Sequence, residues 1–140
     1  MEVILAGSFV SADLQRSVGM EATGPLSKQE FWRAAHSVDV CVNLRYPSAH
    51  ETSGIGVLLM GIGKPVIFTA GKELARLPEN MHLSVEHGPC EEEELSELLI
   101  WLANNREAGR MIGQNAANHI AKEHSLERVA ARYWEVLRRC

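Results

Sequence analysis

A polar segment between two apolar ones carries the side chains of this sequence that are best suited to bind an anion. Its members are Arg45, His50, Glu51, Thr52 and Ser53. Thr52 and Ser53 are residue types that cap helix starts, and the apolar, glycine-containing residues 54–63 follow them. The free N–H groups at a helix start attract phosphate and similar anions. The segment therefore predicts either an anion site at a helix N-terminus or a polar cap on a tightly packed helix.

Glycine is unusually frequent in the predicted helix. Four glycines fall within ten residues, at positions 54, 56, 61 and 63. Each glycine inside a helix costs about 1 kcal/mol relative to alanine. A helix that carries this cost often needs its backbone to approach something closely. We expect that neighbour to be either an adjacent strand or a ligand.

Two predicted strands position this segment. Residues 40–44 are short, apolar and rich in β-branched side chains, and residues 66–69 form a similar run after Pro65. Strand, polar loop, helix and strand make a βαβ unit, in which the two strands are parallel. Ligands of open α/β sheets bind beyond the carboxyl ends of such strands. The polar segment is expected at that edge.

The same segment resembles a known family. The matching residues are Asn43-Leu44-Arg45-Tyr46-Pro47, Glu51-Thr52-Ser53-Gly54 and Gly63-Lys64-Pro65-Val66. They look like the donor-site signature of family 4 glycosyltransferases, which have the GT-B fold. The closing segments, residues 95–113 and 124–133, are similar to the last helices of that family. The resemblance thus covers nearly the whole chain.

The resemblance implies that this chain is one half of a larger enzyme. GT-B enzymes have two Rossmann-like domains with catalysis in the cleft between them, and the chain is similar only to the C-terminal, donor-binding one. The N-terminal acceptor domain is missing, as is the first βα unit, which carries the Arg and Lys pair that neutralises the donor diphosphate. A strand that begins at residue 3 also suggests a truncated or excised domain. The implied reaction is transfer of a hexose from a nucleoside diphosphate sugar to an acceptor, with retention.

The resemblance also implies roles for individual residues. Glu51 would hold sugar hydroxyls, the N–H groups of Ser53 and Gly54 would face the diphosphate, and Arg45 or His50 would add positive charge. The segment implied to border the nucleotide base consists of Thr23, Gly24, Pro25 and Leu26. No catalytic residue, metal or other cofactor is implied within this half. Glu51 could instead be a helix-start acid and Arg45 a surface ion-pair partner.

One departure from the family concerns its second donor-site glutamate, which holds the nucleotide ribose eight positions after the first. Counting from Glu51 reaches Leu59, and aligning on Gly63-Lys64-Pro65 reaches Leu58. The ribose would lose a charge-assisted hydrogen bond, worth about 1.5–3 kcal/mol. The alternative hypothesis is therefore a non-catalytic Rossmann-like module that binds nucleotide sugars or other proteins.

The rest of the chain completes the predicted architecture. Further strands are expected at residues 3–6, 18–23 and 82–85, and a capping box at Ser27 and Glu30 predicts a helix to Ser37. Helices are expected after Pro89, over residues 106–123 and after Ser125. The predicted fold is a single domain, residues 1–140, of the α/β class: a Rossmann-like open parallel sheet of about five strands with helices on both faces and C-terminal helices.

Composition limits the remaining possibilities. The 140 residues carry a net charge of −4, which gives no basic footprint for nucleic acid. Three widely spaced cysteines favour a reducing cytoplasm, with Cys41 in the core. No apolar run approaches the length of a transmembrane segment. Tyr133 and Trp134 on the last helix predict exposed apolar surface and hence a possible homo-oligomer.

Overall fold

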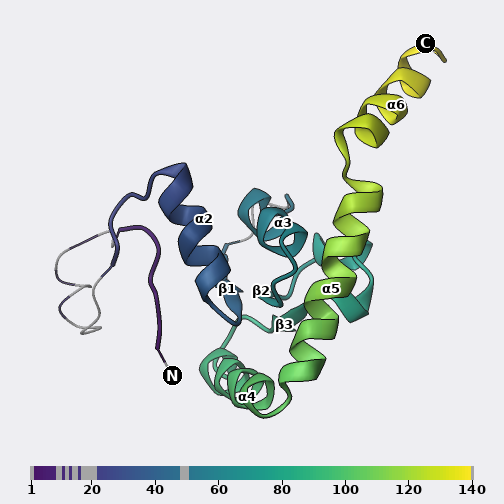
Figure 1. Ribbon diagram of the computed structural model, residues 1–140. Helices are drawn as coiled ribbons and strands as arrows, with labels where there is room; N and C mark the ends of the chain where they lie inside the picture. The colour runs from purple at the N-terminus through teal and green to yellow at the C-terminus, as the bar shows by residue number, and fades with distance from the viewer. Residues whose placement is uncertain are drawn as a thin grey trace. The chain divides into compact units, whose positions relative to one another are not determined.

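The structure is a computed structural model that describes residues 2–8, 11, 13, 16, 22–47 and 51–139. The chain divides into two compact units, Met1–Val38 and Asp39–Cys140, and each is described by itself. The second unit contains the sheet (Figure 1). The expectation that residues 1–140 form a single domain stays a prediction.

The sheet has three parallel strands in the order β1-β2-β3. They are β1 (Cys41–Asn43), β2 (Val66–Thr69) and β3 (Leu83–Val85). Cys41 pairs with Val66, and Ile67 pairs with Leu83. The strand predictions over residues 40–44, 66–69 and 82–85 are confirmed, and so is the parallel βαβ connection.

The predicted five-stranded sheet is wrong in its strand number, because residues 3–6 form no strand. Leu5 makes an isolated bridge to Ala22, and its carbonyl accepts a hydrogen bond from Thr23 N at 3.0 Å. The next bridge, between Gly7 and Gly24, has the opposite sense, so no continuous ladder forms. Residues 18–21, most of the other expected strand, lie outside the described residues.

Helices cover both faces of the three-stranded sheet. Ile67 and Phe68 are neighbours on β2, so their side chains point to opposite faces. α4 (Glu91–Asn104) packs on the face of Ile67 with Leu95, Leu98, Leu99 and Leu102. On the other face, Gly56 of α3 (Gly54–Gly61) lies against Phe68. The part of the fold prediction that concerns helices on both faces is confirmed.

The longest helix, α5 (Arg106–Glu123), runs along α3 (Figure 1). It passes close to the turn between α3 and β2. A Cβ added to Gly113 would overlap the carbonyl group of Gly63, which itself has a φ of +81°. Ala116, one turn further along α5, is fully buried. Two glycines therefore allow α5 to approach the turn that leads into the central strand.

Helix starts agree with the predicted caps. In the first unit, α2 (Lys28–Ser37) begins with the predicted capping box: Ser27 N donates to Glu30 Oε2 at 2.8 Å, and Glu30 N donates to Ser27 Oγ at 3.3 Å. Ser125 caps α6 (Leu126–Leu137) by accepting a hydrogen bond from Arg128 N. Two short 3₁₀ helices, η1 (Leu74–Arg76) and η2 (Glu79–Met81), connect β2 to β3.

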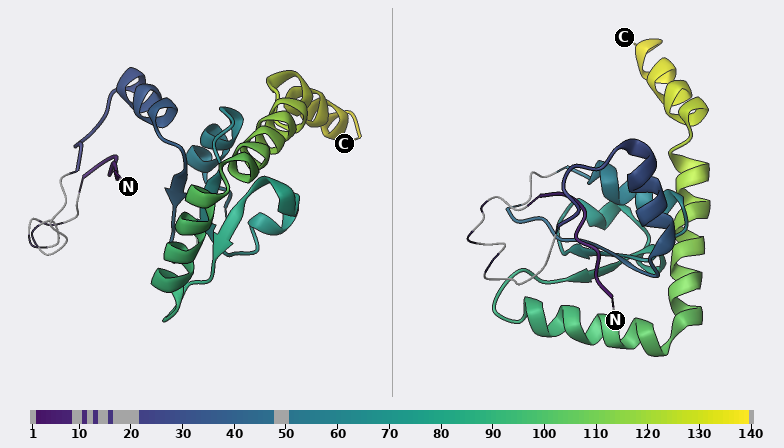
Figure 2. Two further views of the ribbon diagram at one scale, coloured as in Figure 1. Left: turned by 60° about the horizontal axis from the view of Figure 1, so that its bottom comes forward. Right: turned by 60° about the vertical axis from the view of Figure 1, so that its left-hand side comes forward.

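α6 extends beyond the end of α5 and away from the sheet (Figure 2). Glu123 of α5 pairs with Arg128 at 3.0 Å and with Arg132 at 2.7 Å, which holds the polar face of α6. Tyr133 and Trp134 are 69% and 58% exposed. The prediction of exposed apolar surface on the last helix is confirmed, whereas homo-oligomerisation stays a prediction. Among the helices of the described ranges, none is both long and apolar enough to cross a membrane.

Candidate functional site

An open pocket lies at the carboxyl ends of β1 and β2. Its polar lining comes from the end of β1 and the loop after it, the start of α3, and the end of β2 and the segment after it. These residues are Asn43, Arg45, Glu51, Thr52, Ser53, Thr69 and Glu73. Its apolar lining includes Met60 and Phe68, which belong to the core. The pocket is therefore at the edge of the sheet where the sequence predicted it, and it contains four of the six predicted residues for the donor sugar and diphosphate.

The start of α3 supplies backbone donors to this region. Ser53 is the N-cap, and its side chain accepts a hydrogen bond from Gly56 N at 3.1 Å. The first N–H groups of a helix have no partner within the helix. Within the described part of the chain, no hydrogen bond joins the N–H groups of Gly54 or Ile55 to another group. A Cβ added to Gly54 would meet nothing within 4 Å, so the space beside it is open.

The sequence analysis expected the glycines of α3 to lie close to either a strand or a ligand, and the structure assigns different neighbours to different glycines. A Cβ on Gly56 would lie 2.8 Å from Phe68 Cζ, so this glycine is needed for close packing on β2. One on Gly61 would lie 3.4 Å from the side chain of Ile120 in α5. Close packing thus explains Gly56, while Gly54 is the glycine that faces open space at the helix start.

Arg45 and Glu51 form an ion pair in the lining of the pocket. Arg45 Nη2 lies 3.6 Å from Glu51 Oε1, and the two side chains are 41% and 71% exposed. Such an exposed pair contributes no more than about 1 kcal/mol, so a stronger anion can compete for the guanidinium. The backbone of Arg45 is fixed independently, because Arg45 N donates to Thr69 Oγ1 at 2.9 Å. The surface ion-pair interpretation of Arg45 is therefore correct, and it is compatible with an anion-binding role.

Two acceptors in the pocket were not singled out from the sequence. Asn43 Oδ1 is buried from solvent and has no hydrogen-bond partner within the described residues. Glu73 follows β2 and reaches the same pocket. A signal for both existed, because Asn43 ends one parallel strand and Glu73 follows its neighbour in the sheet. Parallel strands bring such residues to one edge.

A stacked pair of aromatic rings joins the loops after β1 and β3. The ring of Tyr46 stacks on that of His87, with centroids 3.5 Å apart, and His87 Nδ1 lies 2.7 Å from Glu91 Oε2 at the start of α4. Glu86 N donates to Glu94 Oε2 at 2.9 Å. The acidic first turn of α4 therefore holds the loop that follows β3, an arrangement that the sequence analysis missed.

The remaining residues that the sequence analysis discussed for the donor site lie elsewhere in the chain or outside the described residues. His50 lies outside the described residues. Leu58 is 49% exposed and Leu59 is buried in α3, and neither lines the pocket. The segment expected to border the base (Thr23, Gly24, Pro25 and Leu26) belongs to the first unit. There the hydroxyl of Thr23 accepts from Gly7 N and donates to the Gly24 carbonyl, so its role at a base stays a prediction.

Two findings in the described segments concern metal and thiol groups. Within them, no three His, Cys, Asp or Glu side chains lie close enough together to hold a metal ion. Cys41 is 8% exposed, and its burial raises the pKa of the thiol, although nearby Lys64 partly opposes this shift. Cys41 is thus a core residue, as the sequence predicted.

Comparison with known proteins adds no assignment. A scan against models of protein families finds no match to this chain, and a search of curated proteins finds no significant relative. The pocket and the residues that resemble the family 4 motif are the features that bear on function.

Proposed function

We propose that this chain is the donor-binding part of a GT-B, family 4 type glycosyltransferase and that it binds a nucleoside diphosphate sugar in the pocket at the start of α3. The observation that carries this proposal is the open helix start beside Arg45, at the carboxyl edge of a parallel sheet. A helix N-terminus with an adjacent guanidinium is suited to a diphosphate, because both supply hydrogen-bond donors and positive charge.

Each part of the ligand has a partner in this proposal. The diphosphate lies at the N–H groups of Ser53 and Gly54 and competes with Glu51 for Arg45; the space beside Gly54 is open. Glu51, released from its ion pair, accepts hydrogen bonds from hydroxyls of the transferred hexose. No described residue is assigned to the chemical step, because catalysis in a GT-B enzyme needs both walls of the interdomain cleft. The isolated chain is therefore proposed to bind donor without transferring sugar.

The second candidate function is a binding or interaction module without catalysis. Two observations favour it: α3 carries Leu58 and Leu59 where the family has an acid, and α6 exposes Tyr133 and Trp134. This candidate and the transferase part share the ligand pocket. They differ in whether the chain, joined to an acceptor domain, supports turnover.

Substitution of Glu51 tests the ligand assignment. Glu51→Ala is expected to leave binding of inorganic pyrophosphate unchanged or slightly stronger, since backbone N–H groups and Arg45 bind it. The same change should strongly reduce any preference for UDP-, ADP- or GDP-glucose over the matching nucleoside diphosphate. Calorimetric titration measures both quantities. We expect weak affinities, in the range of about 1 mM or −4 kcal/mol, because only one wall of the cleft is present.

A matched control is Glu107→Ala, which changes an exposed glutamate on α5 that lies 3.6 Å from Arg110. This substitution should change neither the affinity for pyrophosphate nor the preference for the sugar nucleotide. The proposal fails if Glu51→Ala retains the full preference of the wild type for the sugar nucleotide.

A further inference from the structure

The pocket has a side made of acceptors as well as a side made of donors. Asn43 contributes a buried side-chain oxygen without a partner in the described residues, and Glu73 contributes a carboxylate. Buried acceptors are normally satisfied by a donor, so an unsatisfied one in a ligand pocket indicates where a ligand donor would lie. The N–H groups of α3 and the guanidinium of Arg45 form the other side.

The two sides favour different chemical groups. Ionised phosphate oxygens only accept hydrogen bonds, so they are suited to α3 and Arg45 and are repelled by a carboxylate. Hydroxyl groups can donate to a carboxylate or an amide oxygen. A ligand that satisfies both sides carries an anionic group and neighbouring hydroxyls.

The carboxylate of Glu73 is placed by the chain around it. A Cβ added to Gly71 would lie 2.6 Å from Glu73 Oε1 and from Cδ, so the side chain folds back over Gly71, two residues after β2. Glycine at position 71 provides the room for this arrangement. Because Asn43 pairs with Phe68 in the sheet, the acceptors come from adjacent strand ends.

We propose that Glu73, assisted by Asn43, receives hydroxyl groups of the bound sugar nucleotide and so determines specificity for a hydroxylated ligand. This inference rests on the proposed function and adds a residue to it. It assigns to the segment after β2 the acidic role that α3 lacks, since α3 has Leu58 and Leu59 at the corresponding positions. The hydroxyls belong either to the ribose or to the transferred hexose, and these two sources share the same chemistry.

The test compares four probes: pyrophosphate, UDP, 2′,3′-dideoxy-UDP and UDP-glucose. Wild-type protein should bind UDP more tightly than dideoxy-UDP if Glu73 holds the ribose, or UDP-glucose more tightly than UDP if it holds the hexose. One charge-assisted hydrogen bond predicts a ratio of about tenfold or more. Glu73→Gln should reduce that ratio at least several-fold and should leave pyrophosphate affinity unchanged or higher.

Two further variants make the result decisive. Gly71→Ala keeps the carboxylate but displaces it, so it should reduce the same ratio. Glu79→Gln alters an exposed glutamate of η2 outside the pocket lining and should change nothing. An NMR spectrum of the backbone amides of each variant establishes that the variant is folded.

Either of two results would overturn the inference, and they are distinguishable. If Glu73→Gln retains every hydroxyl preference while pyrophosphate still perturbs the amides of Ser53 and Gly54, only the role of Glu73 is wrong. If pyrophosphate and UDP perturb no amide near the start of α3 in the wild type, the proposed function itself is wrong and this inference falls with it.

Discussion

Replacing Gly113 with alanine is expected to lower the free energy of unfolding of the second unit by about 2 kcal/mol or more. The added Cβ would overlap the Gly63 carbonyl and lie 3.2 Å from the carbonyl carbon of Lys64. Both neighbours are backbone, and they are fixed, because Gly63 N donates to Met60 O at 3.0 Å and Lys64 N donates to Leu59 O at 3.2 Å. Overpacking costs about 1–3 kcal/mol and occasionally more. Because the overlap here is with backbone atoms, we expect a cost of about 3 kcal/mol or more, which the helix-propensity gain of about 1 kcal/mol offsets only in part.

Gly109→Ala is the matched control for this prediction. Gly109 lies in the same helix, so its replacement brings the same propensity gain, but its nearest neighbour is the Cδ2 atom of Leu102 at 3.2 Å. A leucine side chain can shift by a few tenths of an ångström more easily than a hydrogen-bonded turn. Urea unfolding followed by circular dichroism measures both variants. Equal stabilities for the two would contradict the close approach of α5 to the turn before β2.

Removing the guanidinium of Arg45 is expected to weaken binding of UDP or pyrophosphate by about tenfold or more. Arg45 is the cation that the structure places in the pocket lining, and one charge-assisted hydrogen bond is worth about 1.5–3 kcal/mol. Arg45→Ala also leaves Glu51 without its partner and so adds repulsion of the ligand. The double variant Arg45→Ala/Glu51→Ala, compared with Glu51→Ala alone, isolates the contribution of the guanidinium.

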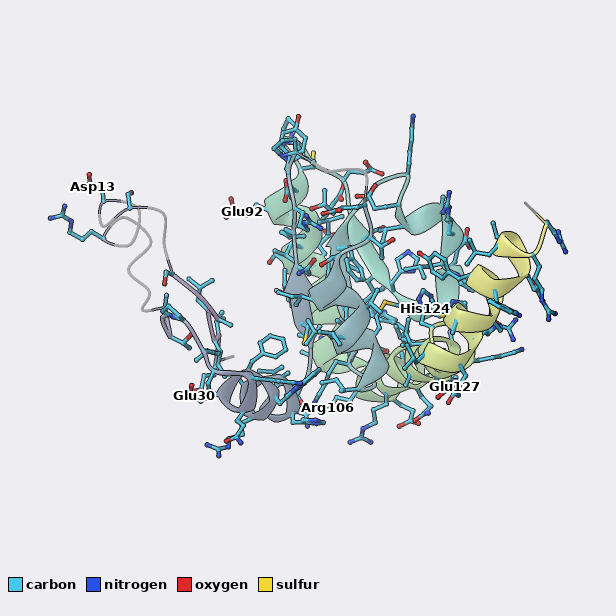
Figure 3. The ribbon with its side chains drawn as sticks, turned by 90° about the horizontal axis from the view of Figure 1, so that it is seen from above. Asp13, Glu30, Glu92, Arg106, His124 and Glu127 are labelled. Atoms are coloured by element: carbon cyan, nitrogen blue, oxygen red, sulfur yellow. The ribbon has the colours of Figure 1, made fainter. Side chains whose placement is uncertain are left out.

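Arg106→Ala serves as the control for Arg45, because Arg106 is exposed at the start of α5 (Figure 3) and does not line the pocket. Its loss removes the same charge from the protein but should leave the dissociation constant within about twofold, since distant exposed charges are screened by salt. A dissociation constant that is the same for Arg45→Ala and the wild type would show that the anion does not meet this side chain.

Local signals were sufficient to predict most elements of the second unit. The run Val66-Ile67-Phe68-Thr69 is apolar and bounded by Pro65 and Ala70, and it forms β2 over those residues. Ser53 and Ser125 cap helices where their residue type predicted it. These features depend on a few neighbouring residues, and a sequence records them directly.

Features that depend on distant contacts were predicted less well. Residues 3–6 have the composition of a buried strand, but Val3 is 56% exposed and only Leu5 forms a bridge. A strand exists only if a partner strand is present, and composition alone does not show that. Glu73 was missed for a similar reason, because its position in the pocket follows from the pairing of β1 with β2 and from the room above Gly71.

The most direct test of the central claim is an NMR titration of the isotopically labelled chain with UDP and with pyrophosphate. If the start of α3 binds the diphosphate, the amide signals of Thr52, Ser53 and Gly54 should shift first and by the largest amounts, and those of α6 should stay in place. Shifts that cluster at another part of the chain, or no shifts at ligand concentrations well above the expected dissociation constant of about 1 mM, would show that this segment is only a helix cap.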